Sequence, residues 1–120
     1  MANPPDILSV AALVGTREMT KLTTTNATAI LAQPASNFVS KVNQIFIANI
    51  DGSANAEIDI FITNSSTDYY LAKTIVIPAD SSLELLSQPI YVINGDELKA
   101  TAGAANAIDI VVSFESITDV

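Results

Sequence analysis

The fold is decided by the stretch KVNQIFIANIDGSANAEIDIFITN, which runs from Lys41 to Asn64. In its second half, apolar side chains alternate with acidic and polar ones. Successive side chains of a β-strand point to opposite faces of the sheet, so a period of two residues gathers the apolar ones on one face. The second half therefore predicts a half-buried antiparallel strand, whose buried face is made of Ala56, Ile58, Ile60 and Ile62.

The first half of the same stretch is apolar on both faces. Ile45 and Ile47 share one face, and the other face carries Phe46, Ala48 and Ile50. Such a strand is either central in its sheet or covered by a partner chain. Between the halves, Asp51-Gly52 is a strong hairpin signal, because glycine takes a positive φ without a Cβ clash. We therefore expect the two halves to pair as a hairpin, through a tight turn or through a longer, bulged loop over residues 51–55.

Short apolar segments bounded by turn residues continue along the chain. We expect further strands at residues 21–25, 28–32, 69–77, 83–86, 90–93, 97–102 and 107–117. Pro78 has no amide hydrogen to donate to a neighbouring strand, so it ends the segment before it or marks an edge strand. Asn94-Gly95-Asp96 predicts a second hairpin, between residues 90–93 and 97–102.

The last segment resembles the second half of the central stretch. Gly52–Ile60 recurs, with one residue deleted, as Gly103–Ile110. The inward side chains of this last strand are predicted to be Ile108, Ile110, Val112 and Phe114, and the outward ones Asp109, Ser113 and Glu115. The recurrence favours equivalent strands in two packed sheets, with chance similarity in a chain rich in alanine, asparagine and isoleucine as the alternative.

The beginning of the chain is less regular. Residues 7–14 allow two helical turns, with Asp6 as N-cap and Gly15 as stop, or a short strand. Pro4-Pro5 cannot enter a helix interior or a central strand, so residues 1–18 are predicted to form an N-terminal arm. The remainder, residues 19–120, is predicted to be a single all-β domain of about eight or nine short strands. It is an antiparallel β-sandwich of jelly-roll type, with a closed barrel as the alternative.

Composition excludes several classes of function. The chain has no cysteine and no histidine, so no thiol or Ser-His nucleophile and no thiolate or imidazole metal site is available. Its net charge is −8 and its five basic residues are scattered, which argues against nucleic acid as a partner. The apolar run in residues 7–14 is far too short to span a bilayer or to act as a signal peptide. Because 49% of the residues are hydrophobic, we expect a protein partner instead.

Candidate sites are explained by local structure. Glu57 and Asp59 share a strand face and read as solvated residues rather than a catalytic pair. Asp51, Asn55 and Glu57, or Asn94, Asp96 and Glu97, could offer oxygen ligands to calcium, but turn geometry accounts for them. The sequons at Asn26 and Asn64 lack a secretory context. We therefore predict no catalytic residue, metal, cofactor or small-molecule substrate, and expect at least one of Tyr69 and Tyr70 to be exposed.

Three segments carry a resemblance to a known class of protein. They are Asn49-Ile-Asp-Gly-Ser53, Ile77-Pro-Ala-Asp-Ser-Ser-Leu-Glu-Leu-Leu86, and the stretch from Gly95 to Glu115. In these segments the chain resembles small virion structural proteins of tailed bacteriophages, particularly phages of marine bacteria and cyanobacteria. The resemblance covers roughly residues 41–117. It implies a place on the capsid as a decoration or cement protein, or on the tail or neck, and it brings no catalytic residue with it.

The expected function is therefore a non-enzymatic capsid decoration protein on the virion surface. Its partners would be the major capsid protein and further copies of itself, as a homotrimer or higher oligomer, without nucleic acid or membrane. The predicted interface residues are Pro4, Pro5, Ile7, Leu8, Leu13, Val14, Phe46 and Tyr70. A tail, neck or fibre component is the alternative, and a carbohydrate-binding sandwich or small sandwich enzyme is a third hypothesis.

Overall fold

The computed structural model describes residues 10–119 of the chain, and these residues form nine strands and no helix. The strands are β1 (Val10–Leu22), β2 (Thr28–Leu31), β3 (Phe38–Asn49), β4 (Ala56–Asn64), β5 (Thr67–Ile77), β6 (Ser82–Glu84), β7 (Ile90–Ile93), β8 (Asp96–Ala102) and β9 (Ile108–Asp119). Pro78 follows directly after β5, as expected from its missing amide hydrogen.

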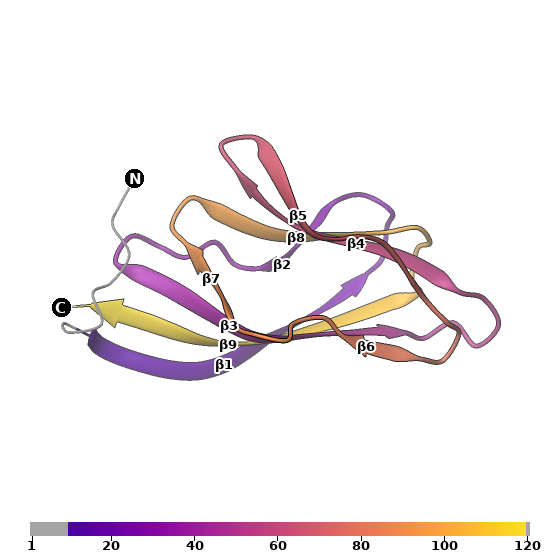
Figure 1. The fold of residues 1–120 in the computed structure, drawn as a ribbon, viewed down its shortest axis with the longest axis horizontal. Coiled ribbons are helices and arrows are strands. Elements are labelled where there is room, and N and C mark those ends of the chain that lie inside the picture. Colours follow the sequence, from indigo (N-terminus) through magenta and orange to yellow (C-terminus); the bar gives the residue numbers. More distant parts are fainter. Residues whose placement is uncertain (1–9, 120) are drawn as a thin grey trace.

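The strands make two antiparallel sheets that lie one over the other (Figure 1). Sheet A has the order β1-β9-β3, and both β6 and β7 pair with the remaining edge of β3. β6 lies opposite Phe46–Ala48 and β7 opposite Val39–Val42, so the two act as one interrupted strand. Sheet B has the order β2-β8-β4-β5. All described pairings are antiparallel, and the predicted sandwich of jelly-roll type is confirmed.

The topology moves the chain back and forth between the sheets. Only the connections β4–β5 and β6–β7 stay within one sheet, and the other six cross to the opposite sheet. Two separate sheets with open edges replace the closed barrel that was the alternative. Neighbouring strands in the sequence therefore mostly face one another across the core instead of pairing side by side.

This topology makes both predicted hairpins wrong. β3 pairs with β9, β6 and β7 in sheet A, whereas β4 pairs with β5 and β8 in sheet B. Likewise, β7 belongs to sheet A and β8 to sheet B. Each pair of apolar strands buries its inner face against the same core from opposite sides. The Asp51-Gly52 and Asn94-Gly95 segments are thus crossovers between sheets, which a local turn signal cannot distinguish from hairpin turns.

The hairpin that does exist joins β4 to β5. Asn64 lies opposite Thr67, and the two residues between them, Ser65 and Ser66, have φ values of 51° and 65°. Positive φ at both central positions is the geometry of a type I′ turn, which usually selects asparagine and glycine. Two serines give no such signal, and the sequence therefore indicated only a loop here.

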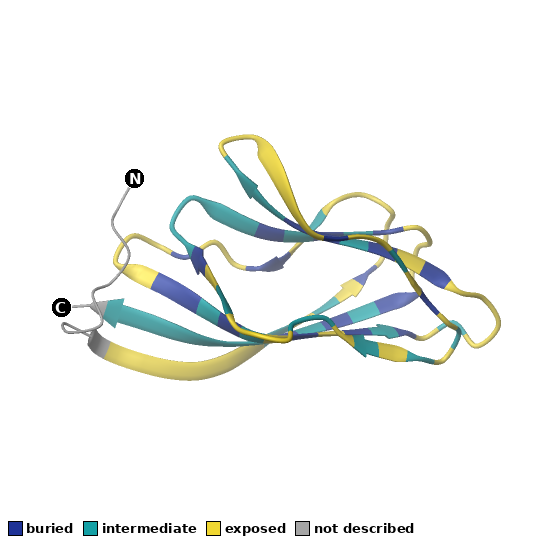
Figure 2. Ribbon diagram, viewed as in Figure 1, coloured by how far each residue is buried: buried dark blue, intermediate teal, exposed yellow. Residues whose placement is uncertain are grey.

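The core lies between the sheets and follows the alternation of the strands. The predicted inward residues of β4 and β9 are confirmed, with Ile60 fully buried and Ile110 exposed by 1%. Leu98, Ala100 and Ala102 of β8 are also buried. Along β8, buried positions in dark blue alternate with intermediate ones in teal in Figure 2. Phe61 lies on the outer face of β4, yet it is only 4% exposed because Tyr70 packs beside it.

The predicted boundary between arm and sandwich, at residue 18, falls inside β1. Residues 10–18 are paired with β9, in an unbroken register from Ala12 to Leu22. The strand alternative for residues 7–14 is therefore correct from Val10 onward, and the helical one is not found there. Residues 1–9 lie outside the described part of the chain. The short strand expected at residues 21–25 is the end of β1, which stops at Leu22.

One buried polar side chain holds the crossover between the sheets. Asn49, at the end of β3, is 2% exposed. Its side-chain amide donates to the carbonyl oxygens of Ala54 and Ile77, both at 2.9 Å, and its Oδ1 accepts from the N–H of Asp51 at 3.0 Å. Its backbone N–H donates to the carbonyl of Ser81. Asn49 thus joins the end of β3 in sheet A to the end of β5 in sheet B.

Replacing Asn49 with alanine is expected to destabilise the fold. The Asn49→Ala variant leaves the buried carbonyl of Ile77 without its donor, and each group left unpaired costs roughly 1–3 kcal/mol. Urea unfolding followed by circular dichroism measures the change. The control is Asn43→Ala on the same strand, whose amide makes one partly buried contact with Glu115 at 3.3 Å. Equal losses in the two variants would contradict the role given to Asn49.

Candidate interaction surface

The outer face of sheet A carries two apolar rows that run across the strands. Residues directly opposite each other on antiparallel strands point to the same side of the sheet. Along each strand the side chains alternate, so residues that follow or precede a core residue point outward. The first apolar row consists of Met19, Val111 and Phe46, from β1, β9 and β3. The second apolar row consists of Leu13, Ile117, Val39 and Ile93, from β1, β9, β3 and β7, and within it Val39 is only 6% exposed. Met19 is 66% exposed and Phe46 41%.

Charged residues on this face balance one another. Lys21 contacts Asp109 at 2.6 Å, and Lys41 lies 3.8 Å from Glu115. Arg17 on β1 and Glu84 on β6 also point outward, and neither forms an ion pair with a described residue. Among the side chains that the structure describes, the face therefore carries three basic and three acidic ones, in a chain whose net charge is −8. It is a neutral, partly apolar surface on an acidic molecule.

A shallow hollow of about 320 Å³ lies beside the first apolar row. It is lined by Met19, Thr20, Lys21, Asp109, Ile110 and Val111. The hollow is open to the surface between β1 and β9.

The outer face of sheet B is organised around Tyr70. The ring of Tyr70 packs at 5.0 Å from the ring of Phe61, and the ammonium group of Lys73 lies 4.7 Å from its centre. Lys73 also lies 3.3 Å from the carboxylate of Asp59, which accepts the N–H of Thr74 at 2.6 Å. Since its ring is already packed against two side chains of the same chain, Tyr70 is not a free platform for stacking a sugar.

Local contacts shift two pKa values. The hydrogen bond and the charge of Asp59, and then Tyr70, raise the pKa of Lys73 above its ordinary value of 10.5. The N–H and hydroxyl of Ser53, with the N–H of Ala54, lower the pKa of Asp51. These contacts confirm turn geometry as the reason for Asp51 in its loop.

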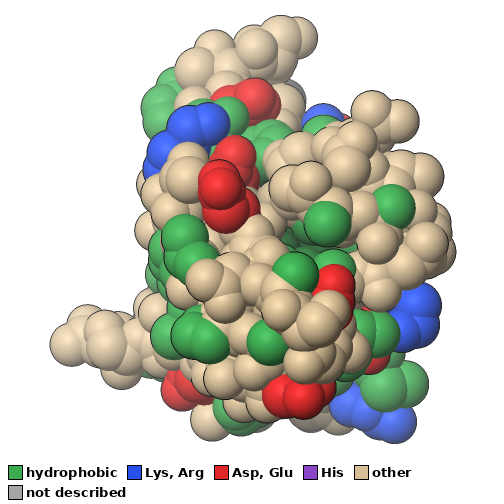
Figure 3. Space-filling view, turned by 90° about the vertical axis from the view of Figure 1, so that its right-hand side faces the viewer, with side chains coloured by type: hydrophobic (Ala, Val, Ile, Leu, Met, Phe, Trp, Pro, Cys, Tyr) green, Lys and Arg blue, Asp and Glu red, His purple; other side chains and the backbone are tan. Residues whose placement is uncertain are grey.

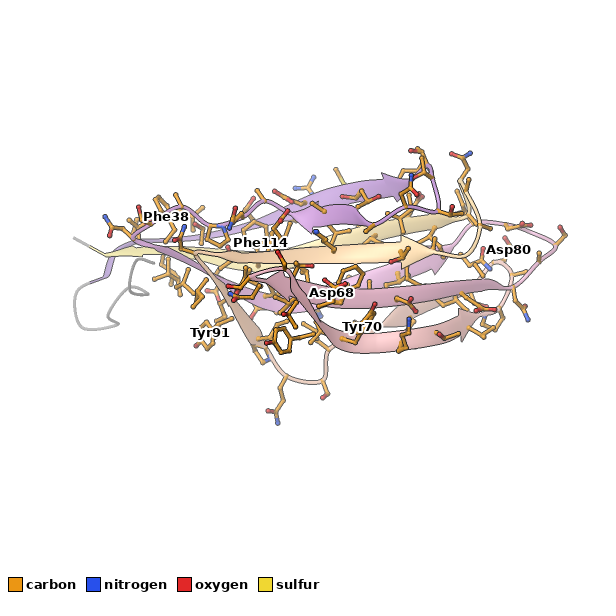
Figure 4. The ribbon with its side chains drawn as sticks, turned by 90° about the horizontal axis from the view of Figure 1, so that it is seen from above. Phe38, Asp68, Tyr70, Asp80, Tyr91 and Phe114 are labelled. Atoms are coloured by element: carbon orange, nitrogen blue, oxygen red, sulfur yellow. The ribbon has the colours of Figure 1, made fainter. Side chains whose placement is uncertain are left out.

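A second open hollow, of about 260 Å³, lies at the end of the sandwich where β1 begins and β9 ends. Phe38 and Phe114 lie at this end in Figure 4, and with Ser40, Ser116 and residues 32–35 they line the hollow. Val14 points to the same inner side of sheet A and is 54% exposed. Sheet B therefore does not cover the inner face of sheet A here.

The oxygen-rich loops are occupied by internal hydrogen bonds. Asp96 accepts from the amide of Asn64 at 2.6 Å and from the N–H of Ile93 at 3.1 Å, and the amide of Asn94 donates to the carbonyl of Pro34. No group of three or more acidic side chains in the described range is arranged to hold a metal ion. Figure 3 views the end with the β3–β4 loop, where acidic side chains are dispersed among hydrophobic ones. Nor does any part of residues 10–119 form an apolar helix long enough to cross a membrane.

The predicted interface residues do not form one patch. Leu13 and Phe46 lie on the outer face of sheet A, Val14 on its inner side, and Tyr70 on the outer face of sheet B; all four are exposed. Pro4, Pro5, Ile7 and Leu8 lie outside the described residues, and whether any of the eight binds a partner stays a prediction. Sequence reasoning missed Met19 and Val111. The outward position of Val111 follows from the alternation around Ile110 and Val112, but only the register with Met19 and Phe46 makes it part of a row.

Comparison with known proteins places the fold but not the function. The chain matches no protein-family model and no curated protein. A protein of the Bacillus endospore appendages, which form disulfide-linked pili, is 17% identical, with a TM-score of 0.52 over 90% of this chain and 88% of that one. A pentameric capsid protein from metagenomic phage sequences is 21% identical, with a TM-score of 0.47, and this chain covers 65% of its length. A second structure of such a pentameric capsid protein is 18% identical, with a TM-score of 0.44 and 66% coverage. At these identities the appendage protein shows a shared fold alone, and TM-scores below 0.5 add nothing to that.

The contact between Lys73 and Asp59 has a measurable consequence. The raised pKa of Lys73 means that its contribution to stability is complete below pH 10.5 and is lost as the pH rises through the pKa of the folded state. In an Asp59→Asn variant, the pKa of Lys73 is expected to fall toward 10.5, as followed by NMR titration of its Nζ. The control is Asp68→Asn, since Asp68 accepts instead from the hydroxyl of Thr63. An unchanged titration in Asp59→Asn would refute the assignment.

Proposed function

We propose that this chain is a non-enzymatic structural protein of a bacteriophage virion that decorates and cements the capsid shell. The observation that carries the proposal is the apolar surface left over after the core is complete. Eleven large apolar or aromatic side chains in the described range are at least 37% exposed, over both outer faces and the open end. Exposed apolar surface of this extent marks sites of protein association.

Such surfaces suit a protein that joins subunits of a shell. Apolar burial contributes ~25 cal/mol per Å², and a standard contact buries about 800 Å² on each partner. Many identical copies on one symmetric lattice add their modest contacts through multivalency. The proposed partners are the major capsid protein and further copies of the chain, as a trimer or higher oligomer on the capsid surface.

The sequence resemblance to virion proteins of marine and cyanobacterial phages over residues 41–117 supports the same proposal. The proposed contact residues are Pro4, Pro5, Ile7, Leu8, Leu13, Val14, Phe46 and Tyr70, to which Met19 and Val111 are now added.

A tail, neck or fibre component is the second candidate. It is favoured by the likeness of the fold to a protein of the endospore appendages, which form disulfide-linked pili. Because this chain has no cysteine, an appendage built from it would depend on non-covalent contacts instead of disulfides.

The number of copies per virion separates the two candidates. Quantitative mass spectrometry of purified particles is expected to find this chain in a simple ratio to the major capsid protein, because a decoration protein repeats with the lattice. A few copies per particle would place it on the tail or neck. Absence from purified virions would refute both candidates.

Deleting residues 1–9 is expected to weaken binding to the shell without unfolding the domain. This truncation removes Pro4, Pro5, Ile7 and Leu8 but leaves β1 intact, since β1 begins at Val10. Co-sedimentation with capsids stripped of the protein measures binding, and circular dichroism verifies the fold. The control replaces residues 1–9 with a glycine and serine segment of equal length. Undiminished binding by the truncated protein would show that the N-terminal segment is not part of the interface.

A further inference from the structure

We propose that the outer face of sheet A joins two copies of this chain, packed face to face about a twofold axis that runs parallel to the strands. This contact goes beyond the proposed function, because it would operate in a shell, in a tail or in free solution. It does not use the outer face of sheet B or the end of the sandwich where β1 begins and β9 ends.

The charge distribution selects this face for contact between copies. Among the side chains that the structure describes, those on the outer face of sheet A are neutral in sum, whereas the others include eight acidic and only two basic ones. The acidic ones are Glu18, Asp51, Glu57, Asp59, Asp68, Asp80, Asp96 and Glu97, and the basic ones are Lys73 and Lys99. Two copies that each carry −8 repel one another in most orientations. Approach through the neutral face keeps the like charges farthest apart.

Glu84 on β6 and the basic residues on β1 are complementary under the twofold axis. Sheet A runs from β1 at one edge to β6 at the other, so rotation about an axis parallel to the strands places β6 of the second copy over β1. Glu84 on β6 lies opposite Phe46 and so continues the first apolar row across the sheet. At the other edge, on β1, the same row ends with Met19. Arg17 and Lys21 are the outward residues on either side of Met19. Glu84 of the second copy therefore lies over a pair of basic side chains, and the contact occurs twice.

The apolar side chains of the first row are complementary under the same rotation. β3 of the second copy lies over β9, so the exposed ring of Phe46 from that copy meets Val111. The hollow lined by Met19, Lys21, Asp109 and Val111 lies beside this point and can receive the ring. A twofold contact repeats the insertion in both directions, which makes the surface self-complementary.

The other possible twofold axis in the plane of the face would bring like charges together. An axis perpendicular to the strands would place β1 over β1 of the other copy. Arg17 and Lys21 would then meet the same basic residues, and Glu84 would meet Glu84. The arrangement of charges on β1 and β6 thus distinguishes one orientation from the other.

Charge reversal tests this arrangement directly. Sedimentation velocity over a range of concentrations is expected to show a monomer–dimer equilibrium for the unmodified chain. Arg17→Glu and Glu84→Arg are each expected to weaken the dimer by about tenfold or more, since each change breaks two symmetric contacts. The double variant is expected to regain part of the lost affinity, because the pair is restored with the opposite polarity. Two single losses without recovery in the double variant would overturn the pairing of these residues.

Apolar substitutions test the face itself. Phe46→Asp and Met19→Asp are expected to abolish the dimer, and Val76→Asp, at a 52% exposed position of β5 in sheet B, is the matched control. Unchanged thermal unfolding verifies that each variant folds. If one of the two variants in the row does not fold, the other still tests the face. A monomer at every concentration, a trimer, or a dimer that tolerates Phe46→Asp would overturn the proposal. None of these results changes the copy number in virions, so the two proposals fail separately.

Discussion

The structure depends on two isoleucine-rich faces that are buried against each other from opposite sheets. Ile58 and Ile60 come from sheet B, and Ile45 and Ile47 come from sheet A, within one buried cluster. Neither apolar face can be buried without the other, since a single sheet has nothing to cover its apolar side. The crossovers of the jelly roll follow from this constraint, because each apolar strand must be followed by a partner on the other side of the core.

The crossovers in turn leave backbone polar groups without strand partners, and Asn49 binds some of these groups. A chain that leaves one sheet for the other carries backbone carbonyl and amide groups past the end of the core, where strand pairing has stopped. The side chain of Asn49 supplies two donors and one acceptor at that point and binds the ends of β3 and β5 to the loop between β3 and β4. A buried polar residue therefore sets where the two sheets meet.

The outer faces differ because the edges and pairings of the two sheets differ. On sheet B, Tyr70 packs against Phe61 and Lys73, and Lys73 forms an ion pair with Asp59, although Val76 stays 52% exposed. On sheet A, the first apolar row lies between two ion pairs, and Arg17 and Glu84, at opposite edges, have no charged partner among the described residues. The first face is stabilised within the chain. The second is better suited to contact another protein, which agrees with a structural protein that acts through association.

The alternation of isoleucine with polar residues determined most of the strands from residue 41 onward and the buried faces of β4 and β9, because side-chain period is a local property of a strand. It favoured, without deciding, equivalent places for β4 and β9 in two packed sheets. The absence of histidine and cysteine excluded several kinds of chemistry in the same direct way. Only the tertiary structure decided which strands pair, since Asp51-Gly52 suits a crossover as well as a hairpin, and Ser65-Ser66 makes the true hairpin without glycine. It also decided which exposed residues share a surface. Met19, Val111 and Phe46 are far apart in the chain, and strand register across three strands is a property of the whole sheet that no segment encodes alone.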